Sequence, residues 1–467
     1  MPWHALIDIS RECKEPLTAQ IESTLRARIS DGELHPGARL PSSRQLAEDV
    51  GVSRSVVVEA YGRLIAEGYL ESVRGSGTRV AAHVAPPAVA TLLDDGTVPR
   101  ARWDLRAGTS PVSGFPHREW LAAYQRAVRA ADPADLDYPP LAGAPALREE
   151  LARYLGRARG VRTTPGQVMA VSGFGQALGL LCTVLAELDI GAIAMEDPCH
   201  HQQRQFIAEA GLRPVPVPLD EEGIDVQALS RTGARAVMVT PTHQFPTGIT
   251  LSAARREALV RWARANDAWV IEDDYDGDLW LEHGARPPAL QRLAPERVVY
   301  GGTASKSLAP GLRSGWLAAP SRLIPLLERA RSLHDLGSDV FTQLALAELM
   351  RSGRFDHHLR RQRARYRARR TSLERAVNRH LPGARVIGSA AGLHAYITLP
   401  RRVDEAELVA RALDFSVLVR GGARHHARPR LAAPALVVGY TGVPHTALAE
   451  AVGALGAAYA RRPGLAA

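Results

Sequence analysis

The sequence predicts a multidomain protein in which a small α+β module precedes a large α/β body that ends in a smaller α/β part. Residues 12–80 form a compact basic segment with short helical patterns, and residues 81–102 read as a linker with few periodic apolar positions. Beyond it, short apolar runs alternate with helical stretches, which is the pattern of a mostly parallel sheet. We expect the large part to span 103–330 and the smaller part 331–467.

Composition excludes several classes of protein. The chain has 467 residues, a formal net charge of +9 and three cysteines, none of them in a Cys-x-x-Cys pair. The cysteines predict neither a disulfide framework nor a structural zinc site. No apolar run reaches the ~18 residues of a membrane span, and the N-terminus lacks the pattern of a secretion signal. We therefore expect a cytoplasmic protein with no membrane partner, whose positive charge is compatible with nucleic acid.

The N-terminal module predicts a helix-turn-helix. Apolar residues at helical spacing predict a first helix over 16–27, and serines can cap a second helix ending at Asp49 and a third over 54–68. The last two helices are joined by the tight turn Gly51-Val52-Ser53. In such a unit the N-terminal side chains of the last helix enter the DNA major groove.

Residues 69–80 predict a two-stranded wing with a glycine-rich tip. Glycines let the backbone approach a phosphate, and flanking arginines supply positive charge. The alternative is a small helical interaction domain whose arginines are merely solvated. The candidate DNA contacts of the whole module are Arg39, Ser42, Ser43, Arg44, Ser53, Arg54, Ser55, Arg74, Gly75 and Gly77.

In the body, apolar runs predict strands at 168–171, 192–194, 236–240, 269–271, 298–300, 393–398 and 435–440. Lys306 follows the fifth run, and among 58 basic residues only Lys14 and Lys306 are lysines. A lysine amine can lose its proton and act as a nucleophile, whereas an arginine cannot. Hydroxyls at Thr303 and Ser305 and the guanidinium of Arg313 could bind a phosphate. Together these groups suit a phosphorylated aldehyde, so pyridoxal phosphate is implied.

Two further segments could complete this site. Acidic residues and Tyr275 follow the run at 269–271, where the sheets of α/β proteins hold their ligands. A carboxylate there could keep a pyridine nitrogen protonated, and a tyrosine could bind the ring oxygen; the alternative is a solvated acidic turn or a cation site. Residues 172–176 open a helix after a strand, so their backbone N–H groups could receive the phosphate.

The body resembles the fold-type I aminotransferases, which have the fold of pyridoxal-phosphate-dependent transferases. Motifs that carry this likeness are Tyr138-Pro139-Pro140-Leu141-Ala142-Gly143, Glu196-Asp197-Pro198 and the segment 240–248. The N-terminal module resembles the winged helix-turn-helix of the GntR regulators through the segment 37–47 and Gly75-Ser76-Gly77-Thr78. The combination resembles the MocR/GabR subfamily of GntR transcriptional regulators. Its members are typically homodimers that bind a double-stranded DNA operator and sense a small-molecule effector.

This resemblance implies a role for each candidate cofactor residue. The aldimine with pyridoxal phosphate would form at Lys306, while Asp273 would face the pyridine nitrogen and Tyr275 the ring oxygen. The phosphate would be held by Ser305 and Arg313, with Thr303 beside them and backbone contacts from Phe174 and Gly175.

The chain departs from the family pattern at two positions. Cys199-His200 stands where Gly-Tyr is usual, so His200 is either a cofactor contact or a pocket wall. Val437 stands where a carboxylate-binding arginine is usual, which makes transamination of ordinary amino acids doubtful. A different anion-binding pocket could come from the preceding arginines, Arg424, Arg428 and Arg430.

We therefore predict a DNA-binding transcriptional regulator that senses its effector at Lys306. The missing arginine favours pyridoxal phosphate itself as effector, with control of vitamin B6 synthesis, over an amine or amino compound. The rival hypotheses are an active aminotransferase with a residual DNA-binding module, and a DNA-binding scaffold that has lost the cofactor. We predict no metal site. The chain has three His-His pairs, and the two adjacent histidines of a pair cannot both reach one ion from a helix.

Overall fold

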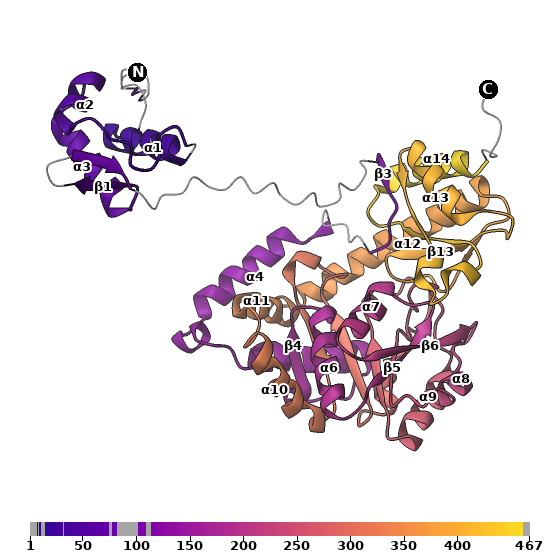
Figure 1. The fold of residues 1–467 in the computed structure, drawn as a ribbon. Coiled ribbons are helices and arrows are strands. Elements are labelled where there is room, and N and C mark those ends of the chain that lie inside the picture. Colours follow the sequence, from indigo (N-terminus) through magenta and orange to yellow (C-terminus); the bar gives the residue numbers. More distant parts are fainter. Residues whose placement is uncertain are drawn as a thin grey trace. The chain divides into compact units, whose positions relative to one another are not determined.

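The computed structural model describes residues 7, 9–10, 15–30, 32–73, 77–81, 101–108 and 114–460. The chain divides into two compact units, Met1–Val98 and Pro99–Ala467 (Figure 1).

The first unit is a winged helix-turn-helix, as predicted. Its elements are α1 (Leu17–Ser30), α2 (Ser43–Val50), α3 (Arg54–Ala66) and the antiparallel wing strands β1 (Leu70–Val73) and β2 (Gly77–Val80). The Ser42 hydroxyl caps α2 by accepting a 3.2 Å hydrogen bond from the Gln45 N–H, and Gly51 ends that helix in the left-handed conformation. One apolar cluster, which includes Leu25, Leu46 and Leu64, holds the three helices together.

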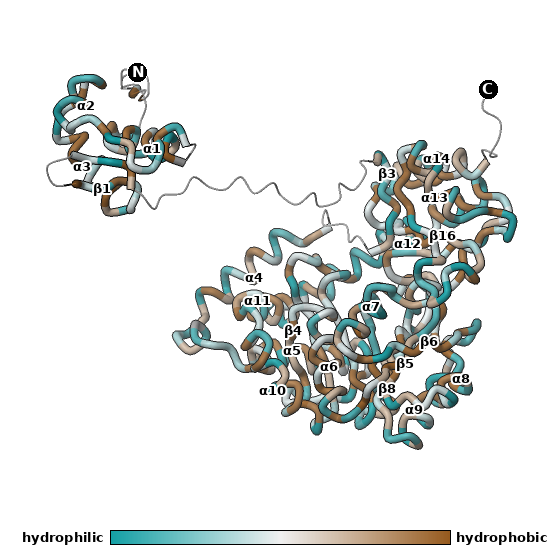
Figure 2. Tube along the Cα trace, in the orientation of Figure 1, coloured by the Kyte–Doolittle hydropathy of each residue, from teal (hydrophilic) through white to brown (hydrophobic). Residues whose placement is uncertain are grey.

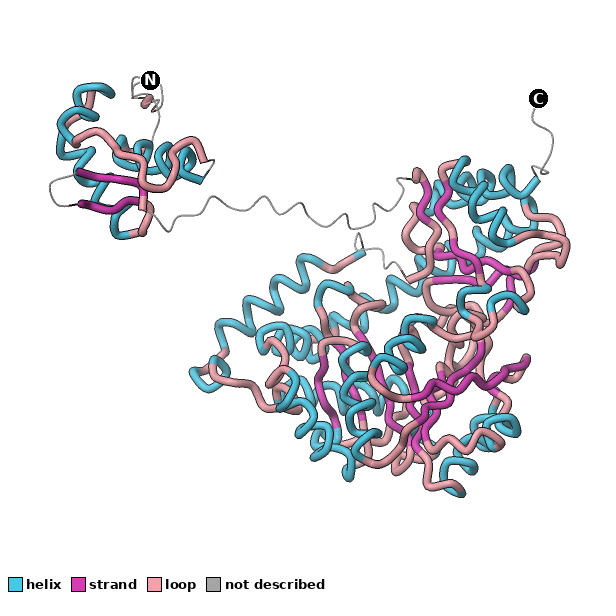
Figure 3. Tube along the Cα trace, viewed as in Figure 1, coloured by secondary structure: helices cyan, strands magenta, loops and turns pink. Residues whose placement is uncertain are grey.

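The second unit is built on an eight-stranded sheet with the order β4-β11-β10-β9-β8-β5-β6-β7. Neighbouring strands from β10 to β6 are parallel, whereas β11 and β7 are antiparallel to the strands beside them. Figure 3 shows these strands side by side between layers of helices. The strands are β4 (Val168–Val171), β5 (Ala192–Asp197), β6 (Arg213–Asp220), β7 (Gly223–Ile224), β8 (Ala236–Val239), β9 (Trp269–Asp273), β10 (Val298–Thr303) and β11 (Gly315–Ala318).

Both faces of this sheet are buried. Along β9, Ile271 packs in one apolar cluster with residues of α6 and α10, while Val270 packs in another with residues of α9. Because side chains alternate between the two faces of a strand, a sheet covered twice reads as a continuous apolar run, visible as brown tube in Figure 2. The helices are α4 (His117–Ala130), α5 (Pro145–Arg159), α6 (Phe174–Glu187), α7 (His201–Glu209), α8 (Val226–Ser230), α9 (Ala253–Ala265), α10 (Ile324–His334) and α11 (Val340–Arg351).

The C-terminal part of this unit forms a smaller α/β layer. Its sheet has the order β12-β13-β16-β15, built from β12 (Arg385–Ile387), β13 (His394–Thr398), β16 (Ala435–Gly439) and β15 (Arg420–Gly421). The helices α12 (Arg354–His380), α13 (Glu405–Asp414) and α14 (Leu448–Ala460) belong to it. The strand β3 (Trp103–Asp104) pairs in parallel with β14 (Val417–Leu418), so the start of the unit is held against its C-terminal part.

The arginine-rich segment 360–370 lies within α12 and contributes to this packing. Arg363 donates to the Asp278 carbonyl at 2.6 Å and Arg367 to the Leu281 carbonyl at 2.7 Å, while Arg370 pairs with Glu374. The contacts of Arg363 and Arg367 fasten α12 to the loop after β9. Within the described residues, no helix combines the length and the apolar character that crossing a bilayer requires.

Candidate functional site

A cavity of about 240 Å³ lies in the second unit, where the carboxyl ends of β8, β9 and β10 meet the smaller C-terminal part. Ligands of open α/β sheets bind at this edge. The cavity brings together most of the predicted cofactor residues, namely Lys306, Asp273, Tyr275, Thr303, Ser305, Phe174 and His200. Gly175 and Arg313 do not line it and are exposed at its margin, by the start of α6.

Lys306 lies in the loop after β10, and its Nζ donates to the Gly108 carbonyl at 3.1 Å. Burial lowers the pKa of this amine, although the carboxylates of Asp276 and Asp273 act in the opposite direction. A lowered pKa increases the fraction of neutral amine, which is the nucleophilic form. A lowered pKa is what a nucleophilic role for Lys306 would require.

Asp273 closes the inner wall at the end of β9. Its Oδ2 accepts a 2.9 Å hydrogen bond from Gln203, whereas its buried Oδ1 has no hydrogen-bond partner among the described residues. Burial raises the pKa of this carboxyl to about 7. A buried acceptor without a donor is costly, and a cationic N–H in the cavity would relieve that cost.

Tyr275 belongs to a buried polar network. Its hydroxyl donates to the His243 carbonyl at 3.0 Å and lies 3.2 Å from the His243 Nδ1, which is in turn 2.8 Å from Asp276 Oδ2. Burial raises the pKa of Tyr275 well above its usual value. The phenol is therefore neutral, and its direction is fixed by His243 and Asp276.

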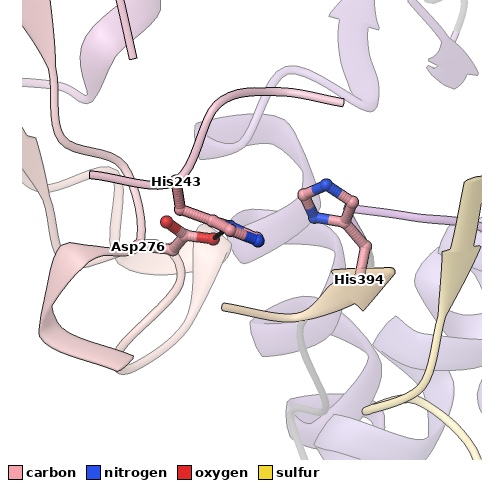
Figure 4. Close-up of side chains that lie close together, drawn as sticks. All are labelled: His243, Asp276 and His394. Atoms are coloured by element: carbon pink, nitrogen blue, oxygen red, sulfur yellow. Dashed lines mark hydrogen bonds and ion pairs between the residues drawn. The ribbon is translucent and has the colours of Figure 1, made fainter. Parts of the chain in front are cut away.

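His243, Asp276 and His394 lie close together (Figure 4), with one possible ligand atom of each within 4.8 Å of the others. The three residues come from three separate segments, so the adjacent His-His pairs of the sequence did not reveal this grouping. The ring of His243 is bonded to Asp276, and the His394 Nε2 donates to the Pro246 carbonyl at 3.1 Å. Because the His243 Nδ1 contacts both Asp276 and the Tyr275 hydroxyl, we interpret the cluster as a network that positions Tyr275.

The predicted phosphate ligands gather at the start of α6. The Thr303 and Ser305 hydroxyls are 3.0 Å apart, and no side chain caps α6, so the N–H groups of its first turn can bind an anion. A Cβ on Gly173 would lie 3.4 Å from the guanidinium of Arg313, which places this cation at the same helix end. Arg313 has a φ of 47°, a conformation uncommon for residues other than glycine.

His200 forms part of the cavity wall. Its ring stacks on His201, with centroids 5.6 Å apart and planes 10° apart, and it also contacts Phe245. Burial, followed by the charges of neighbouring cations, lowers the pKa of His200 to about 4, so the ring is neutral at physiological pH. Its Nδ1 is buried with no hydrogen-bond partner among the described residues.

One cation of the cavity, Arg420 on β15, was not predicted from the sequence. Of the three arginines named instead, Arg424 binds His201, with 2.7 Å between Nη2 and Nε2, whereas Arg428 and Arg430 are exposed. None of those three lines the cavity. The missing signal was strand register, because only pairing with β16 reveals which residue lies beside Val437.

The predicted DNA contacts cluster on the first unit. The Arg54 Nε lies 3.4 Å from the Ser43 hydroxyl, and the Ser53 and Ser55 hydroxyls are 2.8 Å apart, so the start of α3 and the start of α2 share one exposed patch. Arg44 on that patch is exposed and pairs with Glu48. At the wing, a Cβ on Gly77 would lie 3.7 Å from Arg39, while Arg74 and Gly75 are outside the described residues.

Two family models match the chain. "Bacterial regulatory proteins, gntR family" matches residues 17–80, and "Aminotransferase class I and II" matches residues 104–452. Among curated proteins, the probable rhizopine catabolism regulatory protein MocR of Rhizobium meliloti is 32% identical, over 97% of this chain and 96% of its own. The pyridoxine biosynthesis transcriptional regulator PdxR of Corynebacterium glutamicum is 34% identical, over 86% of this chain and 88% of its own.

Solved structures resemble the second unit. The kynurenine aminotransferase of Pyrococcus horikoshii superposes with a TM-score of 0.70 at 26% identity, over 78% of this chain and 91% of its own. The multiple substrate aminotransferase of Thermococcus profundus superposes with a TM-score of 0.71 at 26% identity, over 81% of this chain and 96% of its own. These likenesses confirm the predicted fold of the body.

Proposed function

Because this chain belongs to the MocR-type subfamily of GntR transcriptional regulators, which join a winged helix-turn-helix to an aminotransferase-like domain, we propose that its second unit senses a small molecule at pyridoxal phosphate held by Lys306. The observation that carries this proposal is the pairing of a reactive amine with an unpartnered buried carboxylate, Asp273, on the wall of one cavity.

The residues present fit the cofactor at both of its ends. Asp273 Oδ1 lacks a donor, and a protonated pyridine nitrogen would supply one. At the other end, the uncapped start of α6, the Ser305 hydroxyl and Arg313 offer donors to a phosphate. When bound, the cofactor supplies an electrophilic carbon and an electron-accepting ring.

The protein's own groups then control protons and orientation. Lys306 would hold the cofactor through its amine, and the lowered pKa of this amine keeps part of it neutral and nucleophilic. The Tyr275 phenol keeps its proton, which the His243 carbonyl accepts in this structure, and its hydroxyl would have to turn from that carbonyl to donate to a ring oxygen. His200 is proposed as a neutral ring on the wall, where it can stack on the cofactor.

The output is DNA binding by the first unit. We propose that two copies of the chain form a cytoplasmic homodimer, with 12–80 reading operator half-sites, 81–102 as linker, and 103–330 and 331–467 enclosing the effector. Pyridoxal phosphate itself, or an amine that reacts with it, is the effector. To change operator occupancy, the effector must bind two arrangements of the protein with affinities that differ by about 1–3 kcal/mol.

Spectroscopy and DNA binding test this proposal together. Purified protein is titrated with pyridoxal phosphate while visible absorbance is recorded, and binding to the DNA upstream of its own gene is measured by fluorescence anisotropy. In the wild type we expect a lysine-dependent visible absorbance that borohydride removes, because reduction of the C=N bond leaves the cofactor attached through a stable amine; Lys306→Ala should show neither the absorbance nor the attachment. Lys306→Arg is the matched control, because it keeps the charge and loses the nucleophile.

Two outcomes would contradict the proposal. Absence of that absorbance in the wild type would exclude the cofactor. Rapid turnover of amino donors without any DNA binding would show that the protein is an active aminotransferase and not a regulator.

A further inference from the structure

The smaller C-terminal part places one arginine, Arg420, on the wall of the cavity. Arg420 on β15 is the direct antiparallel partner of Val437 on β16, and both side chains line the cavity. Directly opposed residues of antiparallel strands project to the same face of the sheet with Cβ atoms about 5 Å apart. A long arginine side chain from the neighbouring strand can therefore occupy the space beside Val437.

The guanidinium of Arg420 is not neutralised by an acid. Within the described part of the chain it makes no hydrogen bond or salt bridge, and it is half-buried. Asp104, whose charge raises the pKa of Arg420, is already bonded to Arg106 through both oxygens, at 3.0 Å and 2.7 Å. Burial and the positive charges of Arg424 and Arg106 lower the pKa of Arg420. Such a half-buried cation, beside like charges, is stabilised by an incoming anion.

A second donor beside the Arg420 guanidinium is the Nδ1–H group of His201, a neutral histidine. Arg424 can only donate, so the His201 Nε2 that it contacts accepts, and the hydrogen of that ring is on Nδ1. This buried Nδ1 has no partner among the described residues. His425 packs edge-on against His201 with centroids 5.3 Å apart, and both rings line the cavity.

We propose that the effector is a primary amine that also carries an acidic group, and that Arg420 binds this anion beside Val437 while the amine reaches the cofactor at Lys306. The assignment rests on the proposed function, because it takes the cofactor as the partner of the amine. A carboxylate and a phosphonate share the required chemistry, since both accept two parallel N–H donors from a guanidinium. Arg420 thus provides an anion-binding group that the sequence alone did not reveal.

The test compares amines that carry an acidic group with one amine that lacks it. L-Alanine and β-alanine both give ethylamine on loss of the carboxylate, and aminoethylphosphonate carries a phosphonate in place of that group. Calorimetry on the protein loaded with pyridoxal phosphate measures the dissociation constant of each ligand. We expect at least one acidic amine to bind about ten-fold or more tightly than ethylamine, since a hydrogen-bonded charge pair contributes that much.

Substitutions assign the effect to Arg420. Arg420→Gln should remove the preference for the acid and leave ethylamine binding unchanged, and Arg420→Lys should restore it in part. Arg430→Gln is the matched control, because Arg430 is exposed and outside the cavity. The preferred acid distinguishes a carboxylate effector from a phosphonate-like one.

Other results would overturn the assignment. Equal affinity for ethylamine and all three acids would do so, as would an acid preference that persists in Arg420→Gln. Both can arise while pyridoxal phosphate still binds Lys306, so they are separate from failure of the proposed function, which shows as loss of cofactor absorbance before any amine is added.

Discussion

Arg159 and Asp274 form a salt bridge of 2.6 Å between Nε and Oδ2, with both side chains only 1% exposed. Arg159 ends α5, and Asp274 directly follows β9 and Asp273. Burial alone would raise the pKa of Asp274, but the Arg159 guanidinium outweighs burial and holds it below its usual value. The Tyr300 hydroxyl donates to the same oxygen at 2.7 Å. This pair therefore anchors the segment that carries Asp273 and Tyr275.

Removing one member of this pair should strongly destabilise the second unit. Arg159→Ala leaves a buried carboxylate without its cation, so we expect the free energy of unfolding to fall by about 3–5 kcal/mol. Arg157→Ala is the control, since Arg157 is 63% exposed in its bridge to Asp356 and should cost at most about 1 kcal/mol. Chemical denaturation measures both; equal effects would refute the anchoring role.

Asp273 should make stability depend on pH. Burial raises its pKa to about 7 from a usual value of 3.8, so the folded state holds a proton that the unfolded state releases between these values. The stability that this proton provides is fully present below about pH 4 and is lost as pH rises through 7. The total loss in unfolding free energy is on the order of a few kcal/mol.

Comparison with Asp273→Asn isolates this effect, because Glu196 and the cavity histidines titrate in both proteins. The difference in unfolding free energy between variant and wild type should increase from pH 5 to pH 8 in favour of the variant. A difference that does not change with pH would show that Asp273 has an ordinary pKa. Pyridoxal phosphate should make this difference in unfolding free energy change less with pH, since a cation at Oδ1 favours the charged carboxylate.

The sequence predicted the fold well because each unit has a strong local pattern. The apolar run 168–171 coincides with β4, and the capping serine at position 42 starts α2 as expected. The strand β11 was not predicted, because Gly315-Trp316-Leu317-Ala318 is short and has no alternation to reveal it. Its burial depends on antiparallel pairing with β10 and β4, which is a long-range property.

Cavity residues were predicted where they lie at the ends of neighbouring strands of the large sheet and missed where they come from the smaller part. Lys306 and Asp273 follow neighbouring strands of one sheet, so their meeting could be inferred from strand order. Arg420 and His394 come from the smaller part, and their approach to the cavity depends on how that part packs on the large sheet. No local pattern encodes that contact.

The His243–Asp276 pair should tune the cofactor through Tyr275. We expect His243→Asn and Tyr275→Phe each to shift the visible absorbance of bound pyridoxal phosphate, and the double variant to shift it no further, because both act through one phenol. Cofactor affinity should change by less than about ten-fold, since one neutral hydrogen bond is involved. Additive shifts in the double variant would argue that His243 acts independently of Tyr275.

Zinc provides a second test of the same cluster. If His243, Asp276 and His394 form only a hydrogen-bonded network, neither zinc nor a chelator should change the difference in thermal midpoint between the wild type and His394→Gln. A zinc-dependent rise in the midpoint that His394→Gln abolishes would instead identify a metal site, because a bound ion stabilises the folded state by mass action.

Arg54 should determine operator affinity without affecting the cavity. It is exposed at the first position of α3, where a helix-turn-helix presents its side chains to DNA, and its Nε lies near the Ser43 hydroxyl. Arg54→Ala should weaken operator binding by about 1–3 kcal/mol if it reads a base edge, or lower the salt dependence by about one charge if it contacts a phosphate. Arg63→Ala, in the last turn of the same helix, is the control because Arg63 pairs with Glu59. Fluorescence anisotropy over a series of salt concentrations separates the two kinds of contact. The absorbance of bound pyridoxal phosphate should be the same in both variants, and an equal loss of DNA binding in both would place the DNA contact elsewhere on the module.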